Sequence, residues 1–386
     1  MTVSLLWWIV GGVCMLYGMG MAALAYGRMR SARALPDRTL PDRLSVVVPA
    51  RNESDSITHC LDALQNQTLP AHTTLEIIVV DDQSNDATRV RAQRSLRTAV
   101  VAGSDKAADP VHQVHTLPDA WGAGKEAAVA YGAERATGTV VLVLDADCVP
   151  PPLWAATLAR ACTVETPVAC GPVRYDVDPE RWMQRFQALE FLGLNAYGAG
   201  TAGLGWPTIC NGGNMAVHRS LIAALPEEQI ATHLAADELL LQHVAYQTDG
   251  SVRYVWHNEA CVTTAPAPSW TAFWQQRKRW AHATRSYHAV PWLCTLGIFV
   301  AHAVLLGVCL VGATDPNTLS QPAVAGLLAK MGADLLLLLP ASHTVGHRDL
   351  MRSYIPASLL QLGYVVGAGL HGVFGAIRWK GRTVSE

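Results

Sequence analysis

Apolar runs at both ends of the chain constrain its fold more than any other feature of the sequence. Residues 1–27 contain no Asp, Glu, Lys or Arg, and the run Leu5–Tyr26 is long enough to cross a hydrocarbon core of about 30 Å as a helix. Basic residues follow this run at once, namely Arg28, Arg30, Arg33, Arg38 and Arg43. The positive-inside rule therefore places the residues after the run in the cytoplasm and the N-terminus outside.

A cleaved signal peptide is the alternative for this run, because Ala23-Leu24-Ala25 resembles a small-residue cleavage site. A signal peptide carries its basic residues before the apolar stretch, whereas here they come after it. The charge placement favours a retained membrane anchor.

Three further apolar stretches lie near the C-terminus, at 289–313, 322–346 and 353–377. The middle stretch contains Lys330 and Asp334, whose spacing puts them on one helical face, where pairing would lower their cost in lipid. We expect two or three of the stretches to span a membrane.

The basic tail limits how many of these stretches cross. If all three cross, the residues around Arg348 and Arg352 are cytoplasmic, but Arg378, Lys380 and Arg382 end outside, against the positive-inside rule. One stretch could therefore be interfacial or re-entrant.

Composition excludes several classes of protein. Half of the residues are hydrophobic and only 16% are charged, which excludes a disordered chain. The 29 basic and 31 acidic residues give a net charge of −2, so nothing in the overall charge favours nucleic acid as a partner. Nine scattered cysteines without a CxxC pair argue against a disulfide framework or a structural zinc site.

The segment from residue 44 to about 285 has an ordinary soluble composition, in which short apolar runs alternate with amphipathic ones. Strands are predicted at 44–49, 75–80 and 139–144, and helices at 54–65, from about Asn85, and at 124–136. This alternation predicts an α/β domain with a doubly wound, mostly parallel sheet. Ligands of such sheets bind beyond the carboxyl ends of the strands.

Acidic pairs stand at two of these strand ends. Asp81 and Asp82 follow the second predicted strand, and Asp145 and Asp147 follow the third. Buried unpaired charge is costly, so these side chains need a partner, and two carboxylates at D-x-D spacing suit a divalent cation that also holds a diphosphate. The alternative is that each pair caps the helix that follows it.

Seven short segments in a fixed order extend this pattern: 47–53 (VVPARNE), 79–88 (VVDDQSNDAT), 124–125 (GK), 144–147 (LDAD), 211–216 (NGGNMA), 236–240 (ADELL) and 275–280 (QQRKRW). Together they resemble a membrane-anchored family 2 glycosyltransferase with a GT-A fold, over about residues 44–285. The resemblance implies an α/β, Rossmann-like doubly wound sheet with transmembrane helices added.

The resemblance also implies a set of site residues. The nucleoside of a sugar nucleotide, most often UDP, would be bracketed by Ala50, Glu53, Asp81 and Asp82. Lys125 would lie near the nucleotide, and Asp145 and Asp147 would hold Mg²⁺ or Mn²⁺ on the diphosphate. The turn of Asn211, Gly212, Gly213 and Asn214 would approach the transferred sugar. The Q-x-x-R-W motif, Gln276, Arg279 and Trp280, would close over the diphosphate and the acceptor end of the site.

The family's catalytic base is an aspartate followed by apolar residues at helical spacing. Asp237 fits this pattern through Leu240, Leu241 and Val244, but Glu238 is adjacent and Ala236 replaces the acid that usually precedes the base. The choice between Asp237 and Glu238 stays open. A carboxylate is needed here because a hydroxyl must lose its proton as it attacks.

Trp270–Tyr287 combines aromatic and cationic residues directly before an apolar stretch, as expected of a helix at the headgroup level. The alternative is that this segment serves only as a membrane anchor.

The expected parts of the chain are a transmembrane helix (1–27), a basic linker (28–43), a cytoplasmic GT-A domain (44–268), the interfacial Q-x-x-R-W helix (269–288), a membrane region (289–377) and a tail (378–386).

The expected activity is inverting, metal-dependent transfer of a sugar, a hexose by expectation, from a nucleotide-sugar to a hydroxyl of a membrane lipid at the inner membrane. One alternative is a processive polysaccharide synthase, because Q-x-x-R-W is found in both kinds of enzyme. Another is a membrane scaffold or transporter half without catalytic activity. The sequence does not determine the oligomeric state.

Overall fold

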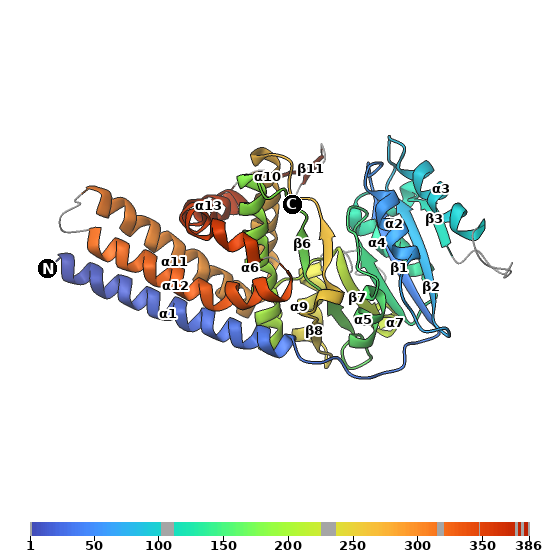
Figure 1. Cartoon of the computed structure of the whole chain (residues 1–386), viewed down its shortest axis with the longest axis horizontal. Coiled ribbons are helices and arrows are strands. Elements are labelled where there is room, and N and C mark those ends of the chain that lie inside the picture. The colour runs from blue at the N-terminus through green and yellow to red at the C-terminus, as the bar shows by residue number, and fades with distance from the viewer. Residues whose placement is uncertain are drawn as a thin grey trace. The chain divides into compact units, whose positions relative to one another are not determined.

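The computed structural model describes residues 2–101, 112–224, 237–314, 320–346, 348–374, 377–379 and 382–384 (Figure 1). The chain forms two compact units. The sheet unit comprises Met29–Asp176 and Thr201–Ala265, and the helical unit comprises Met1–Arg28, Val177–Gly200 and Pro266–Glu386.

The sheet unit is built on a seven-stranded sheet with the order β3-β2-β1-β4-β7-β5-β8. Its strands are β1 (Arg43–Ala50), β2 (Thr74–Asp81), β3 (His112–Thr116), β4 (Val140–Leu144), β5 (Val168–Cys170), β7 (Asn214–His218) and β8 (Val252–Tyr254). Only β7 runs antiparallel to its neighbours. The expectation of an α/β, mostly parallel sheet is confirmed.

Helices, 3₁₀ turns and a separate strand pair are also described in the sheet unit. Its α-helices are α2 (Ile57–Gln65), α3 (Thr88–Val101), α4 (Lys125–Arg135), α5 (Trp154–Ala161), α7 (Arg219–Ala224) and α9 (Asp237–Gln247). The 3₁₀ turns are η1 (Asp119–Trp121) and η2 (Asn258–Ala260), and β6 (Val173–Tyr175) pairs in parallel with β9 (Val262–Thr264). Helix α4 packs on β1 and β2, and α5 packs on β4, β5 and β7.

The apolar runs explain why the acidic residues lie at one edge of the sheet. Strands β1, β2 and β4 are buried along nearly their whole length, as expected for parallel strands covered on both faces. Because β1 pairs in parallel with both β2 and β4, the carboxyl ends of all three strands meet at the same edge. The acids at the ends of β2 and β4 are thereby brought to that edge.

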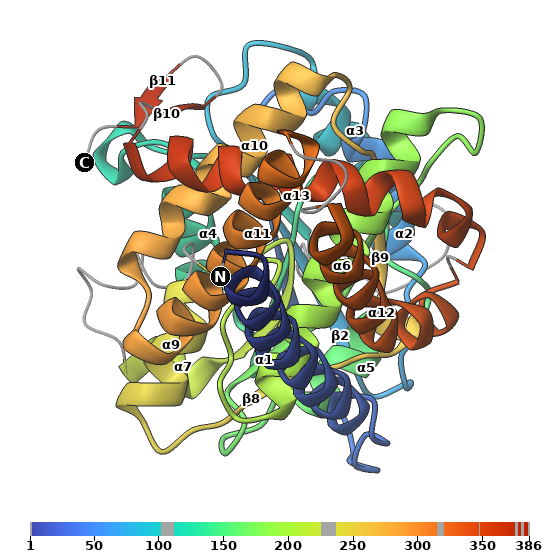
Figure 2. The ribbon, with the colours of Figure 1, turned by 90° about the vertical axis from the view of Figure 1, so that its left-hand side faces the viewer.

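The helical unit contains α1 (Thr2–Ser31), α6 (Trp182–Gly203), α10 (Trp270–Ala283), η3 (Thr284–Ser286), α11 (Ala289–Thr314), α12 (Ser320–Thr344), η4 (Arg348–Ser353), α13 (Tyr354–Phe374) and the strand pair β10 (Ile377–Trp379) and β11 (Arg382–Val384). The last residues of α1 and α6 fall in the sheet unit. Helices α1, α11 and α12 lie side by side, and Figure 2 looks along them.

Among the described residues, three helices are long and apolar enough to cross a membrane, within Ser4–Ser31, Ala289–Thr314 and Ser320–Thr344. The third apolar stretch near the C-terminus forms α13, which is not among them. The expected pairing inside α12 is confirmed, because Lys330 Nζ lies 2.8 Å from Asp334 Oδ2 and both side chains are buried.

Candidate functional site

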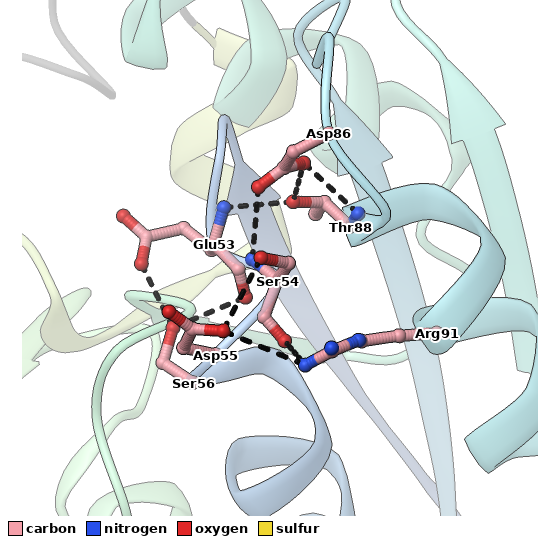
Figure 3. Close-up of polar contacts among 7 residues, drawn as sticks. All are labelled: Glu53, Ser54, Asp55, Ser56, Asp86, Thr88 and Arg91. Carbon is pink, nitrogen blue, oxygen red and sulfur yellow. Dashed lines mark hydrogen bonds and ion pairs between the residues drawn. The ribbon is translucent and has the colours of Figure 1, made fainter.

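The loops that follow β1 and β2, residues 51–56 and 82–88, are joined by a network of hydrogen bonds (Figure 3). The Glu53 amide donates to Thr88 Oγ1 at 2.7 Å, and the Ser54 amide donates to Asp86 Oδ2 at 3.2 Å. Asp86 Oδ1 in turn accepts from the Thr88 amide at 2.9 Å, and Arg91 Nη1 donates to the Ser54 carbonyl. The network fixes the two loops against each other.

The Asp86 carboxylate carries much of this network. Desolvation raises the pKa of Asp86, but the hydrogen bonds from Thr88 and Ser54 together outweigh it and lower the pKa to about 2. The backbone contributes as well, since Asn52 and Gln83 adopt positive φ angles of 54° and 53° at corresponding places in the two loops.

The side chains of Asp81 and Asp82 are buried, yet each has one oxygen without a hydrogen-bond partner among the described residues, Oδ1 in both cases. Asp82 Oδ2 accepts from the Gly124 amide and from Arg51 Nη1, each at 3.1 Å. Such orphaned acceptors are costly unless a donor from a ligand or water satisfies them. The strand edge therefore presents two acceptors suited to a ligand with N–H or O–H groups.

The acids after β4 form a second group. Lys125 Nζ, at the N-terminus of α4, lies 2.6 Å from Asp145 Oδ1, and both side chains are about one third exposed. The Asp147 side chain is exposed, but protein packed around its carboxylate, together with the charges of Asp145 and Glu53, raises the pKa of Asp147 to about 6. The charges of two other carboxylates thus act on Asp147.

The 211–214 turn lies directly against this group. The Asp145 amide donates to the Gly213 carbonyl at 3.3 Å, and a Cβ added at Gly213 would lie 2.3 Å from Asp145 Oδ2. Only glycine leaves room for the carboxylate at this position. The structure therefore brings together the D-x-D acids and the turn that the sequence predicted.

The Asn214 side chain is hydrogen-bonded on all sides to groups of the protein. It is fully buried, accepts from Trp154 Nε1 at 2.7 Å, and donates to the carbonyls of Pro172 and Ala260, each at 2.8 Å. All of these partners belong to the protein, so the Asn214 side chain holds the turn in place. That the turn of residues 211–214 approaches the transferred sugar stays a prediction.

The candidate bases lie at the start of α9. Leu240, Leu241 and Val244 are fully buried, as the helical spacing predicted. Asp237 is the first residue of the helix, but its side chain lies outside what the structure describes, and Glu238 is half-buried. The assignment of the base to one of these two residues stays a prediction.

The Q-x-x-R-W residues lie on α10 in the helical unit. The Trp280 ring stacks on Phe191 of α6 with a centroid distance of 5.7 Å, and the Arg277 guanidinium lies 4.2 Å from the Trp280 centroid. Arg277 is itself buried and paired with Glu190 of α6. The pattern of α10 had suggested a cationic side chain at the lipid surface. The buried pairing of Arg277 with Glu190 contradicts this for Arg277.

Two residues of these sites were not identified from the sequence. Arg51 pairs with Asp82. The sequence signal that could have identified this pair is a cation directly after β1 and an acid directly after β2, the parallel neighbour of β1. Glu190 pairs with Arg277, and no local pattern marks it, because its partner lies 87 residues away.

Comparisons with known proteins agree with this geometry. The model of "Glycosyl transferase family 2" matches residues 45–225, and that of "Glycosyl transferase family group 2" matches residues 140–338, about half of the chain. The mannosyltransferase PcManGT from Pyrobaculum calidifontis, solved with GDP-Man and Mn²⁺, has a similar fold, with a TM-score of 0.55 and 18% identity over 96% of this chain and 99% of that protein.

Curated relatives are similar over shorter lengths. The "Probable glycosyltransferase YdaM" of Bacillus subtilis (strain 168) is 27% identical over 248 residues, 63% of this chain and 55% of the relative. The "Undecaprenyl-phosphate 4-deoxy-4-formamido-L-arabinose transferase" of Pseudomonas fluorescens (strain Pf0-1) is 33% identical over 109 residues, 28% of this chain and 29% of the relative. The match thus spans about half of the first relative and less of the second. By its family match and its sheet, the chain belongs to glycosyl transferase family group 2 and is a glycosyltransferase with a GT-A fold.

Proposed function

We propose that this glycosyltransferase moves a hexose from a nucleoside diphosphate sugar, UDP-linked by expectation, to a hydroxyl of a membrane lipid. The crowding of Asp145, Asp147 and Glu53 at the carboxyl edge of the sheet carries the proposal. Like charges are held together at a cost, which a cation and a bound diphosphate would relieve. The orphaned oxygens of Asp81 and Asp82 would accept hydrogen bonds from the nucleoside.

The donor set fits a hard divalent cation. Asp145 and Asp147 offer carboxylate oxygens, and Gly213 leaves space beside Asp145. Among the described residues, no group of three or more His, Cys, Asp and Glu side chains is arranged to hold a metal ion by itself. Two carboxylates suit Mg²⁺ or Mn²⁺ that takes its other ligands from phosphates and water. When bound, this cation would neutralise charge on the departing diphosphate.

The chain's own residues would complete the reaction. Lys125 is paired with Asp145 and would turn its ammonium to the diphosphate when a cation takes over that carboxylate. Asp237, or Glu238 beside it, would remove the proton of the acceptor hydroxyl. A single base implies one displacement with inversion at the sugar carbon, by analogy with inverting carbohydrate enzymes.

A lipid acceptor is supported by the helical unit. Three of the described helices have the length and apolarity to cross a bilayer, and basic residues at and after the end of α1 favour a cytoplasmic sheet unit at the inner membrane. One relative is named as a transferase that acts with undecaprenyl phosphate, a lipid carrier. We therefore infer that the acceptor hydroxyl is presented from the membrane.

The test uses the full chain in nanodiscs with radiolabelled nucleotide-sugars, a total membrane lipid extract and Mg²⁺ or Mn²⁺. The expected result is label in an organic-extractable product of low mass. Label in a high-mass, ethanol-insoluble product would instead identify a processive polysaccharide synthase. Asp147→Asn should abolish transfer without unfolding the protein. The base is tested by comparing Asp237→Asn with Glu238→Gln. The variant that still binds the donor but no longer transfers the sugar identifies the base.

A further inference from the structure

Helix α13 exposes apolar side chains and turns polar ones toward the protein, which is the reverse of a helix on the surface of a soluble protein. Its exposed side chains are apolar apart from His371 in the last turn, and Ile355, Leu359 and Leu370 are 63%, 50% and 47% exposed. Two of its polar side chains face the protein, where Lys330 Nζ donates to Ser358 Oγ at 3.2 Å and to Gln361 Oε1 at 2.6 Å. An apolar outer face of this length requires an apolar environment.

The direction of α13 differs from that of the three helices long enough to span. Tyr354, its first residue, donates from its hydroxyl to the Met331 carbonyl of α12 at 2.5 Å. Further along, Gly369 lies so close to Phe299 of α11 that an added Cβ would be 2.7 Å from the ring.

Distances along the neighbouring helices give the geometry. At about 1.5 Å per residue, Met331 lies about 20 Å from the end of α12 at Thr344, and Phe299 lies about 15 Å from the start of α11 at Ala289. These two ends are on the same side of the bundle if both helices span. Helix α13 therefore meets α11 and α12 at similar depths and runs across them. Figure 1 shows α13 nearly end-on where α11 and α12 lie in the plane, and Figure 2 shows the reverse.

Close packing fixes α13 to α10 at its other end. A Cβ added at Gly367 would lie 2.9 Å from the Trp274 ring, and one added at Gly372 would lie 2.5 Å from Ala281 Cβ. The Gly372 carbonyl is 3.1 Å from His282 Nδ1. Helix α13 is thus packed directly against α10, the helix that carries the Q-x-x-R-W motif.

We propose that α13 does not cross the bilayer but lies in its cytoplasmic leaflet, with its outer face covered by lipid acyl chains. Three crossings, by α1, α11 and α12, then place the basic residues at and after the C-terminal end of α1, those of η4 and those of the tail on the same side. These residues are Arg28, Arg30, Arg33, Arg348, Arg352, Arg378, Lys380 and Arg382. Four crossings would put the last three on the opposite side, against the positive-inside rule. An in-plane helix with an apolar face and basic flanks suits a bilayer that contains anionic lipids.

The first experiment locates the C-terminus of the full chain in a Gram-negative host. Fusions after Glu386 to green fluorescent protein and to alkaline phosphatase are compared at matched expression. We expect fluorescence and no phosphatase activity, because the tail is cytoplasmic. An active phosphatase with a dark fluorescent protein would overturn the proposal.

The second experiment tests what covers the outer face of α13. Nitroxide labels are placed on Leu359→Cys and Leu370→Cys in nanodiscs with anionic lipids, with the native cysteines replaced, and collisions with oxygen and with a water-soluble nickel chelate are measured. Val90→Cys, an exposed apolar position on α3 in the sheet unit, is the matched control. Labels on α13 should collide mainly with oxygen and the Val90 label mainly with the chelate. Equal access of the chelate to all three labels would contradict lipid contact. Neither experiment depends on sugar transfer, so the proposed activity can fail while this proposal stands.

Discussion

Arg277 of α10 and Glu190 of α6 form an ion pair whose side chains are only 3% and 4% exposed. The Tyr364 hydroxyl of α13 donates to the second oxygen of Glu190, so three helices meet at one carboxylate. Arg277 also lies over the rings of Phe273 and Trp280, at 4.4 and 4.2 Å from their centroids. The pair therefore holds the tryptophan of the Q-x-x-R-W motif.

Removing one partner of this pair should be severe. Glu190→Gln leaves the Arg277 charge buried without a counter-charge, which costs about 3–5 kcal/mol of folding free energy. Thermal unfolding in detergent measures the loss. Arg181→Ala is the control, because Arg181 pairs with Asp178 at an exposed site, 70% and 47% exposed, and should change stability by at most about 1 kcal/mol. Equal, small effects of both variants would show that the buried pair contributes little.

Lys125 should compete with a divalent cation for Asp145. Lys125→Met removes the ammonium that is 2.6 Å from Asp145, so the donor-free protein should bind Mn²⁺ about two- to fivefold more tightly, as expected for a partly exposed pair. Sugar transfer should fall, since the diphosphate loses a cation. Lys125→Arg keeps the charge and should leave Mn²⁺ affinity nearly unchanged. Calorimetric titration measures the Mn²⁺ affinity of each variant. Weaker Mn²⁺ binding by Lys125→Met would exclude competition between Lys125 and the cation for Asp145.

Gly213 should be intolerant of any side chain. The methyl group of Gly213→Ala would lie 2.3 Å from Asp145 Oδ2 and 2.5 Å from its Cγ, so the carboxylate must move. We expect at least a tenfold loss of Mn²⁺ affinity and transfer, with a melting temperature close to that of the wild type. Gly18→Ala, where nothing lies within 4 Å of the added Cβ, is the control for a neutral change. Unaltered Mn²⁺ binding by Gly213→Ala would show that Asp145 is not part of the metal site.

Metal affinity should depend on pH through Asp147. Its pKa is raised to about 6, so protons compete with the cation below pH 6, and Mn²⁺ affinity should fall by up to tenfold for each further unit. Above about pH 7 the carboxylate is ionised and affinity should level off. Glu53→Gln removes one of the charges that raise this pKa and should shift the fall to lower pH. Titrations between pH 5 and 8 that show constant affinity would refute the coupling.

Asp86 should stabilise the joined loops only above the acid range. Its pKa is about 2 in the folded protein and near 3.8 ordinarily, so its contribution is complete above about pH 4 and is lost as pH falls toward 2. The difference in melting temperature between wild type and Asp86→Asn should therefore shrink as pH falls from 5 to 2.5. Asp55→Asn, at a 99% exposed side chain, should show no such trend. A difference for Asp86→Asn that is independent of pH would contradict the assignment.

Much of the fold could be predicted because its signals are local. Buried β-branched runs gave β1, β2 and β4 to within one or two residues, and the acids at their ends followed from the geometry of parallel strands. The Lys330–Asp334 pair was predictable for the same reason, since residues four apart on a helix are neighbours. The later strands β5, β7 and β8 were not named, because β5 and β8 have only three residues each and β7 runs antiparallel to its neighbours.

The sequence by itself determined the class of the sheet, the position of the acids on it and the apolar helices, because each depends on a periodicity or a run within a few residues. Only the tertiary structure decided that Glu190 partners Arg277, that Asn214 holds its turn, that Gly213 must admit Asp145, and that α13 runs across its neighbours. These relationships join segments far apart along the chain. Their energies come from packing and from the burial of paired charges, which leave no pattern in either segment alone.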